Sequence, residues 1–167
     1  NFYVENQRGG INPHDKLSPN LSTLIIKSHT KDGQEMGKEF KIPKEIRDIM
    51  AEHQGTTFLA YFYNKAKKED PTVEASDFRY DGPKPKTKES AVIMLADSIE
   101  AAVRTLEDKD PVSVEKMIRK LITAKIDDDQ LSDADLTLKE IELIIKTFVK
   151  VLGGVYHNRI KYPDQKK

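Results

Sequence analysis

The chain has 167 residues, enough for roughly one domain that buries about 70% of the surface its unfolded form exposes. It contains no cysteine, which excludes disulfides and thiolate-based metal or nucleophile chemistry, so any metal must bind through His, Asp or Glu. The 28 Lys and Arg residues balance 28 Asp and Glu residues, so no long-range field attracts nucleic acid or anionic lipid. We therefore expect no bulk nucleic-acid partner.

The ends and the apolar runs point to a piece of a larger protein. No apolar run approaches the roughly 20 residues that a transmembrane helix requires, so we expect no membrane span in this stretch. The opening NFYVENQRGG lacks an initiator Met and the basic and apolar parts of a signal peptide. We expect the chain to be an excised part of something longer.

Apolar residues recur with helical spacing between clusters of Gly and Pro, which predicts an all-α fold, a helical bundle. Ser18 and Pro19 are typical of a helix start, Thr87 and Asp110 of N-caps, and Thr137 with Glu140 of a capping box. A break of about 17 residues before Thr87 is longer than compact domains normally leave without a use, and a binding loop is one such use. The expected helices cover residues 19–29, 34–40 after a turn at Gly33, 43–54, 56–70, 89–107, 111–126 and 137–154.

The strongest candidates for functional residues are His29, His53 and Asp97. His29 either interacts with the carbonyls at the end of the first helix or binds a ligand, and His53 lies in line with a core stripe, as a hydrogen-bonded core residue also would. Asp97 interrupts the apolar run VIMLADSIEAA, where a carboxylate must be paired, hydrogen-bonded or metal-bound unless it sits at the stripe's edge and faces water. Two His and one Asp from three helices are a metal-ligand set that helical bundles use, although their spacing matches no local metal motif.

Other patterns predict less. The acidic run DDDQLSDAD at 127–135 lacks the Gly and the final Glu of a calcium loop and is typical of a solvated loop. The segment GPKPKTK places Lys84 where it can grip a phosphate, or where an ordinary surface loop lies. His14 and Asp15 are adjacent, and adjacent side chains rarely aim at one centre. No nucleophile elbow, Walker or Rossmann pattern is present.

Five segments together carry a family resemblance. NPHDKLSP, IIKSHTKDG, AEHQGTTFLAYFY, FRYDGPKPKTKESAVIMLADSIEAAVR and YHNRIKYP closely resemble the cytoplasmic HD domain of the seven-transmembrane HD phosphodiesterases of the PgpH type. The resemblance implies a single all-helical HD-type phosphohydrolase domain over residues 1–167. It also implies hydrolysis of cyclic di-AMP to the linear dinucleotide by a metal-activated hydroxide, on the cytosolic side of a membrane to which upstream helices tether the domain.

The same resemblance assigns residues to roles. His29, His53 and Asp97 look like metal ligands for two divalent ions, iron or manganese, which can activate a water and clamp phosphoryl oxygens. The family's His-Asp pair and an earlier His belong before Asn1, so we expect catalysis to need residues that precede this stretch. Gln54 stands where two-metal relatives often carry a second consecutive His.

For the substrate, we expect Lys84 and His14 to contact phosphate and Tyr63, within the run YFY, to stack on an adenine, unless that run packs in the core. A competing hypothesis is a non-catalytic helical domain that binds a nucleotide or a signalling partner. A third is a phosphohydrolase acting on other nucleotides, with the same metal site and a different pocket.

Overall fold

The computed structural model describes residues 12–107 and 109–157, with side chains as far as residue 153. Within these ranges the fold is all-α, as expected, and its extended pairing is limited to an isolated antiparallel bridge between Phe58 and Arg79. Each described helix is too short or insufficiently apolar to cross a lipid bilayer. The elements are η1 (Pro13–Lys16), α1 (Pro19–Glu39), α2 (Lys44–Glu52), α3 (Ala60–Glu69), η2 (Ala75–Phe78), α4 (Lys88–Thr105), α5 (Pro111–Asp127) and α6 (Leu138–His157).

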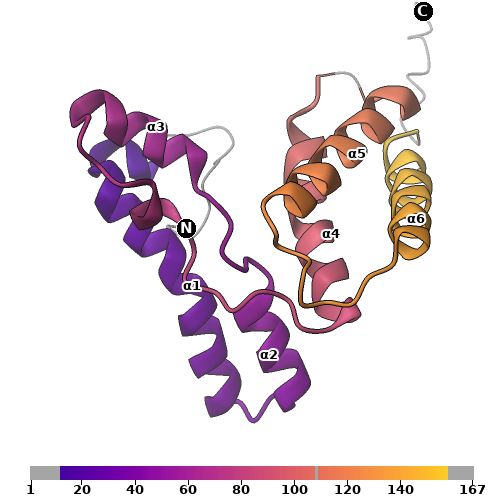
Figure 1. Ribbon diagram of the computed structural model, residues 1–167, viewed down its shortest axis with the longest axis horizontal. Coiled ribbons are helices and arrows are strands. Elements are labelled where there is room, and N and C mark those ends of the chain that lie inside the picture. Colours follow the sequence, from indigo (N-terminus) through magenta and orange to yellow (C-terminus); the bar gives the residue numbers. More distant parts are fainter. Residues whose placement is uncertain (1–11, 108, 158–167) are drawn as a thin grey trace, which may run out of the picture.

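The helices form two lobes, each with its own core (Figure 1). In the first lobe α1 packs against both α2 and α3, and in the second α5 packs against both α4 and α6, while α2 contacts α4 across the junction. The first core takes its members from α1, α3 and the segment around η2, the second from α4 to α6 and the 131–134 segment. The first contains Ile26, Leu59, Phe62, Ala66, Phe78 and Tyr80; the second contains Ala91, Met94, Leu95, Ile99, Val103, Val114, Ile118, Ile122, Leu131, Ala134 and Ile145.

The predicted caps are confirmed. Ser18 accepts a hydrogen bond from the backbone N–H of Leu21, Thr87 from that of Ser90, and Asp110 from those of Val112 and Ser113. Thr137 and Glu140 form the reciprocal capping box at the start of α6, with Glu140 N–H donating to Thr137 Oγ1 and Thr137 N–H donating to Glu140 Oε2. These local signals place the starts of four helices.

The predicted turn at Gly33 is wrong. α1 runs without interruption from Pro19 to Glu39, and the chain reverses instead at Lys41, whose φ of 55° is left-handed. A glycine inside a helix costs only about 1 kcal/mol relative to alanine, and packing of α1 against α2 and α3 outweighs that cost. His29 therefore lies in the middle of a helix, which removes its interpretation as a partner for terminal carbonyls.

The segment before α3 and the long break after it also differ from expectation. Residues 56–59 are not helical, because Phe58 pairs with Arg79 and Leu59 N–H donates to the carbonyl of Phe78. The break is not a free loop either, since Phe78 and Tyr80 are buried in the first core. Long-range pairing of this kind leaves no helical or alternating signal in the sequence.

Candidate functional site

His29 and His53 meet at the open side of the α1–α2 hairpin. The Nε2 atom of His29 lies 3.0 Å from the Nε2 atom of His53. His29 projects from the middle of α1, and His53 occupies the position just after the last turn of α2. Both side chains are half-buried, and the edge of the Tyr80 ring packs against His29. The structure therefore brings His29 and His53 together, as expected.

The other ring nitrogen of each His faces a backbone carbonyl. His29 Nδ1 lies 2.6 Å from the carbonyl oxygen of Ile26, and His53 Nδ1 lies 2.9 Å from that of Met50. A carbonyl only accepts, so each Nδ1 carries a proton, and a ring with that single proton presents a lone pair at Nε2. Burial lowers the pKa of His29 below 6.5, and repulsion from His53 adds to this against the opposing effects of the Ile26 carbonyl, Asp97 and Asp32. His29 is therefore neutral at pH 7.

Two lone pairs 3.0 Å apart repel unless a cation or an extra proton lies at them. An imidazole whose Nδ1–H is held by a carbonyl is the arrangement in which His binds metals, because the bond fixes the tautomer and the ring's direction. The donor set at this point therefore fits a divalent cation on chemical grounds. It contains no sulfur, in keeping with metals that prefer imidazole and carboxylate.

Asp97 belongs to the other lobe and lies beside the His pair. It projects from α4, and its Oδ2 accepts a hydrogen bond of 3.0 Å from Gln54 Nε2. Its negative charge is near enough to oppose the fall in the pKa of His29. Of the alternatives that the sequence left open, the structure shows the edge position, because the Asp97 side chain is exposed at the edge of the apolar stripe.

The three expected ligands, His29, His53 and Asp97, do not all converge on one point. Across residues 12–107 and 109–157, no three His, Asp or Glu side chains converge closely enough to hold an ion as they stand. His29 and His53 converge fully, whereas Asp97 shares its Oδ2 with Gln54. The arrangement is thus a two-nitrogen site with a carboxylate beside it.

Lys84 contacts the acidic segment rather than the His pair. Its Nζ lies 2.6 Å from Asp129 Oδ2, and its side chain is about one quarter exposed (24%). The acidic run is not the solvated loop expected from its composition, because Gln130 is fully buried and Asp128 pairs with Arg79. The run joins α5 to α6 and also contacts the first lobe.

His14 and the YFY run are largely structural. His14 is buried, with its ring edge against Phe62, which is itself in the first core. Tyr63 is half-buried and packs on Phe58 and Phe78, while Tyr61 is exposed. The interpretation of the run as core packing therefore holds for Phe62, and the contacts of His14 and Tyr63 with a substrate stay predictions.

A groove of about 640 Å³ lies between α1, α2 and the 81–86 segment. Lys27 and Lys31 line it from α1, two residues on either side of His29. At 100° per residue these positions are about 200° around the helix from His29, so the groove and the His pair occupy opposite flanks of the hairpin. The groove is therefore separate from the candidate site.

Comparison with known proteins places this geometry in a family. The model of the HD domain matches residues 9–102, more than half of the chain, and that range includes the His pair and Asp97. The chain belongs to the HD domain family. It is 48% identical over 166 residues to the cyclic-di-AMP phosphodiesterase PgpH of Bacillus subtilis and 48% identical over 165 residues to PgpH of Listeria monocytogenes, with 99% of this chain covered in both.

Solved structures agree with the sequence relatives. The crystal structure of the L. monocytogenes PgpH HD domain in complex with cyclic di-AMP matches with a TM-score of 0.88 at 47% identity, covering 96% of this chain and 74% of that one. A second crystal structure of the L. monocytogenes PgpH HD domain matches with a TM-score of 0.86. The HD domain described here spans only 23% of the length of the PgpH relatives.

Sequence reasoning missed one residue that contacts this HD domain's site region, Gln130. It is fully buried, and it hydrogen-bonds to Thr56 in the turn that follows His53. The acidic neighbours of Gln130 predict solvent exposure, and no local pattern indicates a partner 74 residues away.

Proposed function

We propose that this HD domain is the catalytic part of a metal-dependent phosphodiesterase that hydrolyses cyclic di-AMP to the linear dinucleotide. The observation that carries the proposal is the His29–His53 pair, whose Nε2 lone pairs face each other at 3.0 Å beside Asp97. The names of its relatives at 48% identity support the substrate, and so does the cyclic di-AMP complex of the similar HD domain.

His29, His53 and Asp97 would hold the cation. When bound, a divalent ion supplies an acidified water as nucleophile and neutralises charge on the phosphoryl oxygens. Three donors do not complete two coordination shells, so we propose that two iron or manganese ions bind with further ligands from residues outside this chain, including a His-Asp pair. The chain's own contribution is to hold the Nδ1 proton of each imidazole at the carbonyl of Ile26 or Met50, so that each Nε2 is aimed at the cation.

Among the candidate substrate-binding residues, we propose Lys84 as the main contact to phosphate. Its ammonium is paired with Asp129, and the pair is partly exposed, so a phosphate can compete for the cation. Tyr63 presents a half-buried ring for stacking. His14 is the weakest of the three residues, because its ring is buried against Phe62 and must be uncovered before it contacts phosphate.

The test uses the full-length protein loaded with Mn²⁺ or Fe²⁺ and cyclic di-AMP as substrate. His29→Ala, His53→Ala and Asp97→Ala are expected to reduce the bound metal and abolish turnover, with little loss of helical circular dichroism. Asp133→Ala is the matched control, since Asp133 is an exposed carboxylate that accepts a hydrogen bond from Ser132 Oγ. It should leave metal content and rate unchanged.

Three outcomes separate the hypotheses. Formation of the linear dinucleotide that disappears in the three ligand variants supports the proposal. Tight binding of cyclic di-AMP by metal-loaded wild type without any product would replace it with the non-catalytic binding domain. Faster hydrolysis of another cyclic dinucleotide would retain the metal site and change the substrate.

We also propose that the domain works on the cytosolic side of a membrane, as part of a longer protein that is tethered by helices outside these residues. The support is the share of the relatives' length that the chain spans, 23%, together with the resemblance to the membrane-tethered family. Protease digestion of right-side-out and inverted vesicles tests the orientation. Cleavage within the domain in right-side-out vesicles alone would overturn it.

A further inference from the structure

The candidate site is divided between the two lobes. His29 and His53 belong to α1 and the end of α2, whereas Asp97 belongs to α4, and each lobe has a separate hydrophobic core. Two cores that do not merge leave the lobes free to shift unless specific contacts join them. The distance from Asp97 to the His pair therefore depends on whatever fixes the turn after His53 against the second lobe.

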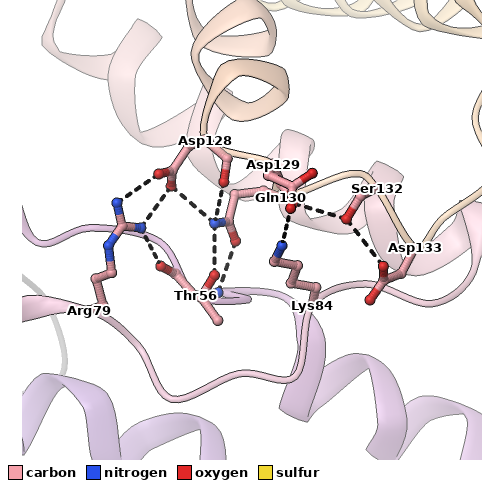
Figure 2. Close-up of polar contacts among 8 residues, drawn as sticks. All are labelled: Thr56, Arg79, Lys84, Asp128, Asp129, Gln130, Ser132 and Asp133. Atoms are coloured by element: carbon pink, nitrogen blue, oxygen red, sulfur yellow. Dashed lines mark hydrogen bonds and ion pairs between the residues drawn. The ribbon is translucent and has the colours of Figure 1, made fainter. Parts of the chain in front are cut away.

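That turn, residues 53–57, is held by the side chain of Gln130. Gln130 Oε1 accepts a bond of 2.9 Å from Thr56 N–H, and Gln130 Nε2 donates to Thr56 Oγ1 at 2.9 Å. The same Nε2 also lies 3.0 Å from both the backbone carbonyl oxygen and Oδ2 of Asp128. Figure 2 shows the amide enclosed by these partners. Every polar atom of this fully buried side chain is thus satisfied.

The end of α5 delivers Gln130 to this position. Gln130 N–H donates to the carbonyl of Lys125 and Asp129 N–H to that of Ile126, while Asp129 has a φ of 56°. These are the bonds of a Schellman motif, in which the residue normally found at the left-handed position is Gly. The motif turns the chain sharply after α5, and Gln130 then points back toward the first lobe (Figure 2).

The turn itself is shaped to accept Gln130. Gly55 has a φ of 54°, and a Cβ at this position would lie 2.5 Å from Gln130 Oε1 and 2.7 Å from Met94 Cε. The backbone of residue 55 therefore sits directly against both the amide and α4. A side chain there would separate the turn from the second lobe.

Two more contacts join the lobes around Gln130. Arg79 forms a bidentate pair with Asp128, at 2.8 and 3.1 Å, and also donates to the carbonyl of Thr56 at 2.9 Å. Lys125 Nζ donates to Thr57 Oγ1 at 2.7 Å. Both converge on residues 56 and 57, at the end of the turn that carries His53 and Gln54.

We infer that Gln130 is a positioning residue that holds the 53–57 turn against the second lobe and thereby sets His53 and Gln54 opposite Asp97. The inference rests on the proposed function for its metal readout, and it has a second readout that does not depend on metal. Gln130 contacts neither the metal nor the substrate. Its effect is on the mutual placement of the donors.

The first experiment measures Mn²⁺ affinity of the full-length protein by electron paramagnetic resonance of the free ion. Gln130→Met keeps the side-chain length and removes all four hydrogen bonds of the amide. It should weaken Mn²⁺ binding about tenfold, which is the lower end of the 10- to 100-fold loss of metal affinity seen when residues that support metal ligands are changed. Thr56→Val removes only the bond to Thr56 Oγ1 and should have a smaller effect in the same direction. Thr56→Ser retains that oxygen and should bind Mn²⁺ as wild type does.

Loss of stability alone is excluded by matched core variants. Ile118 is fully buried in the second core, away from the turn, and Ile118→Val and Ile118→Ala give a graded loss of stability. These two variants should lower the melting temperature to an extent that brackets Gln130→Met while leaving Mn²⁺ affinity near wild type. If the two Ile118 variants weaken Mn²⁺ binding in proportion to the decrease in their melting temperatures, the inference is overturned.

The second experiment measures the placement of the lobes without metal. The chain has no cysteine, so Lys38→Cys on α1 and Lys120→Cys on α5, both exposed, carry two spin labels once any cysteine outside residues 1–167 is replaced. Pulsed electron–electron double resonance measures the distribution of distances between the two labels. Gln130→Met should broaden or shift this distribution, and Ile118→Val should leave it unchanged. An unchanged distribution in Gln130→Met would overturn the inference.

The two experiments also separate this inference from the proposed function. Absence of Mn²⁺ binding and of hydrolysis in wild type would refute the proposed function, while a broadened distance distribution would still support the positioning role. Normal Mn²⁺ binding and turnover by Gln130→Met, with narrow distances, would refute the positioning role and leave the proposed function standing.

Discussion

Gln54 Nε2 donates to Asp97 Oδ2 at 3.0 Å, across 43 residues of sequence and from one lobe to the other. The bond places an amide next to His53, at the position where the family resemblance led us to expect an imidazole in a two-metal site. Imidazole suits iron better than an amide oxygen does, and the amide nitrogen has no lone pair to offer a metal. Gln54 therefore orients Asp97 rather than adding to the nitrogen donors.

Gln54→His should strengthen metal binding, because it adds a neutral imidazole beside His53 and Asp97. The expected result is tighter Mn²⁺ binding and a higher ratio of metal to protein, measured by calorimetry and by elemental analysis of the purified full-length protein. Gln54→Asn keeps an amide and serves as the control, with metal content no higher than wild type. A Gln54→His protein with wild-type affinity and stoichiometry would contradict the role given to this position.

The pair formed by Lys84 and Asp129 leads to two opposite predictions. Lys84→Ala should raise the KM for cyclic di-AMP about tenfold or more with metal content unchanged, since a hydrogen bond to a charged group contributes about 1.5–3 kcal/mol. Asp129→Gly removes the competing carboxylate at 2.6 Å and should lower KM. Initial-rate kinetics with parallel metal analysis check both, and a loss of metal in Lys84→Ala would show that Lys84 was assigned to the wrong role.

Local signals in the sequence were sufficient for much of the fold. Capping residues such as Thr87 and Asp110 act within one helical turn, so their meaning does not depend on distant residues, and the helices that follow them begin where expected. Gly33 shows the limit of such signals. Its weak preference against helix is overcome by the packing of α1 against α2 and α3, which lies outside the local pattern around Gly33.

The candidate site divides in the same way. The His residues were found because the family resemblance marks them, and the structure brings them together at 3.0 Å. Asp97 was singled out beside an apolar stripe and by the same resemblance; the structure places it exposed at the stripe's edge, a choice that the sequence left open because the width of a stripe does not show where its edge lies. Gln130 was missed because its neighbours are acidic while its own partner, Thr56, lies in the other lobe.

Two glycines should respond in opposite directions to alanine. Gly55→Ala forces a side chain into a left-handed backbone and against Gln130 and Met94, and should destabilise the HD domain by about 2 to 4 kcal/mol. Gly33→Ala is the matched control. It lies inside α1 with nothing within 4 Å of the new Cβ, and should stabilise by about 0.5–1 kcal/mol. Urea denaturation measures the free energy of unfolding of both variants. Equal changes in the two variants would mean that the turn at Gly55 accommodates a side chain without strain.

Glu140 at the start of α6 should make stability depend on acid pH. Its bond to Lys88, followed by its contacts with Thr137, lowers the pKa of Glu140 from 4.5 to about 2. A carboxylate whose pKa is lowered on folding adds stability above its unfolded pKa, and this is lost as the pH falls through its folded pKa. The lost stability therefore lies between about pH 4.5 and pH 2.

Glu140→Gln tests this dependence, because it removes the charge and keeps the shape. Its unfolding midpoint in urea should fall below that of wild type at pH 7, and the difference should shrink as the pH decreases through this window. Glu39→Gln is the control, since Glu39 is exposed at the end of α1, and its difference from wild type should be small and nearly independent of pH. A constant difference for Glu140→Gln from pH 7 to pH 2 would mean that its ionised form contributes nothing to folding.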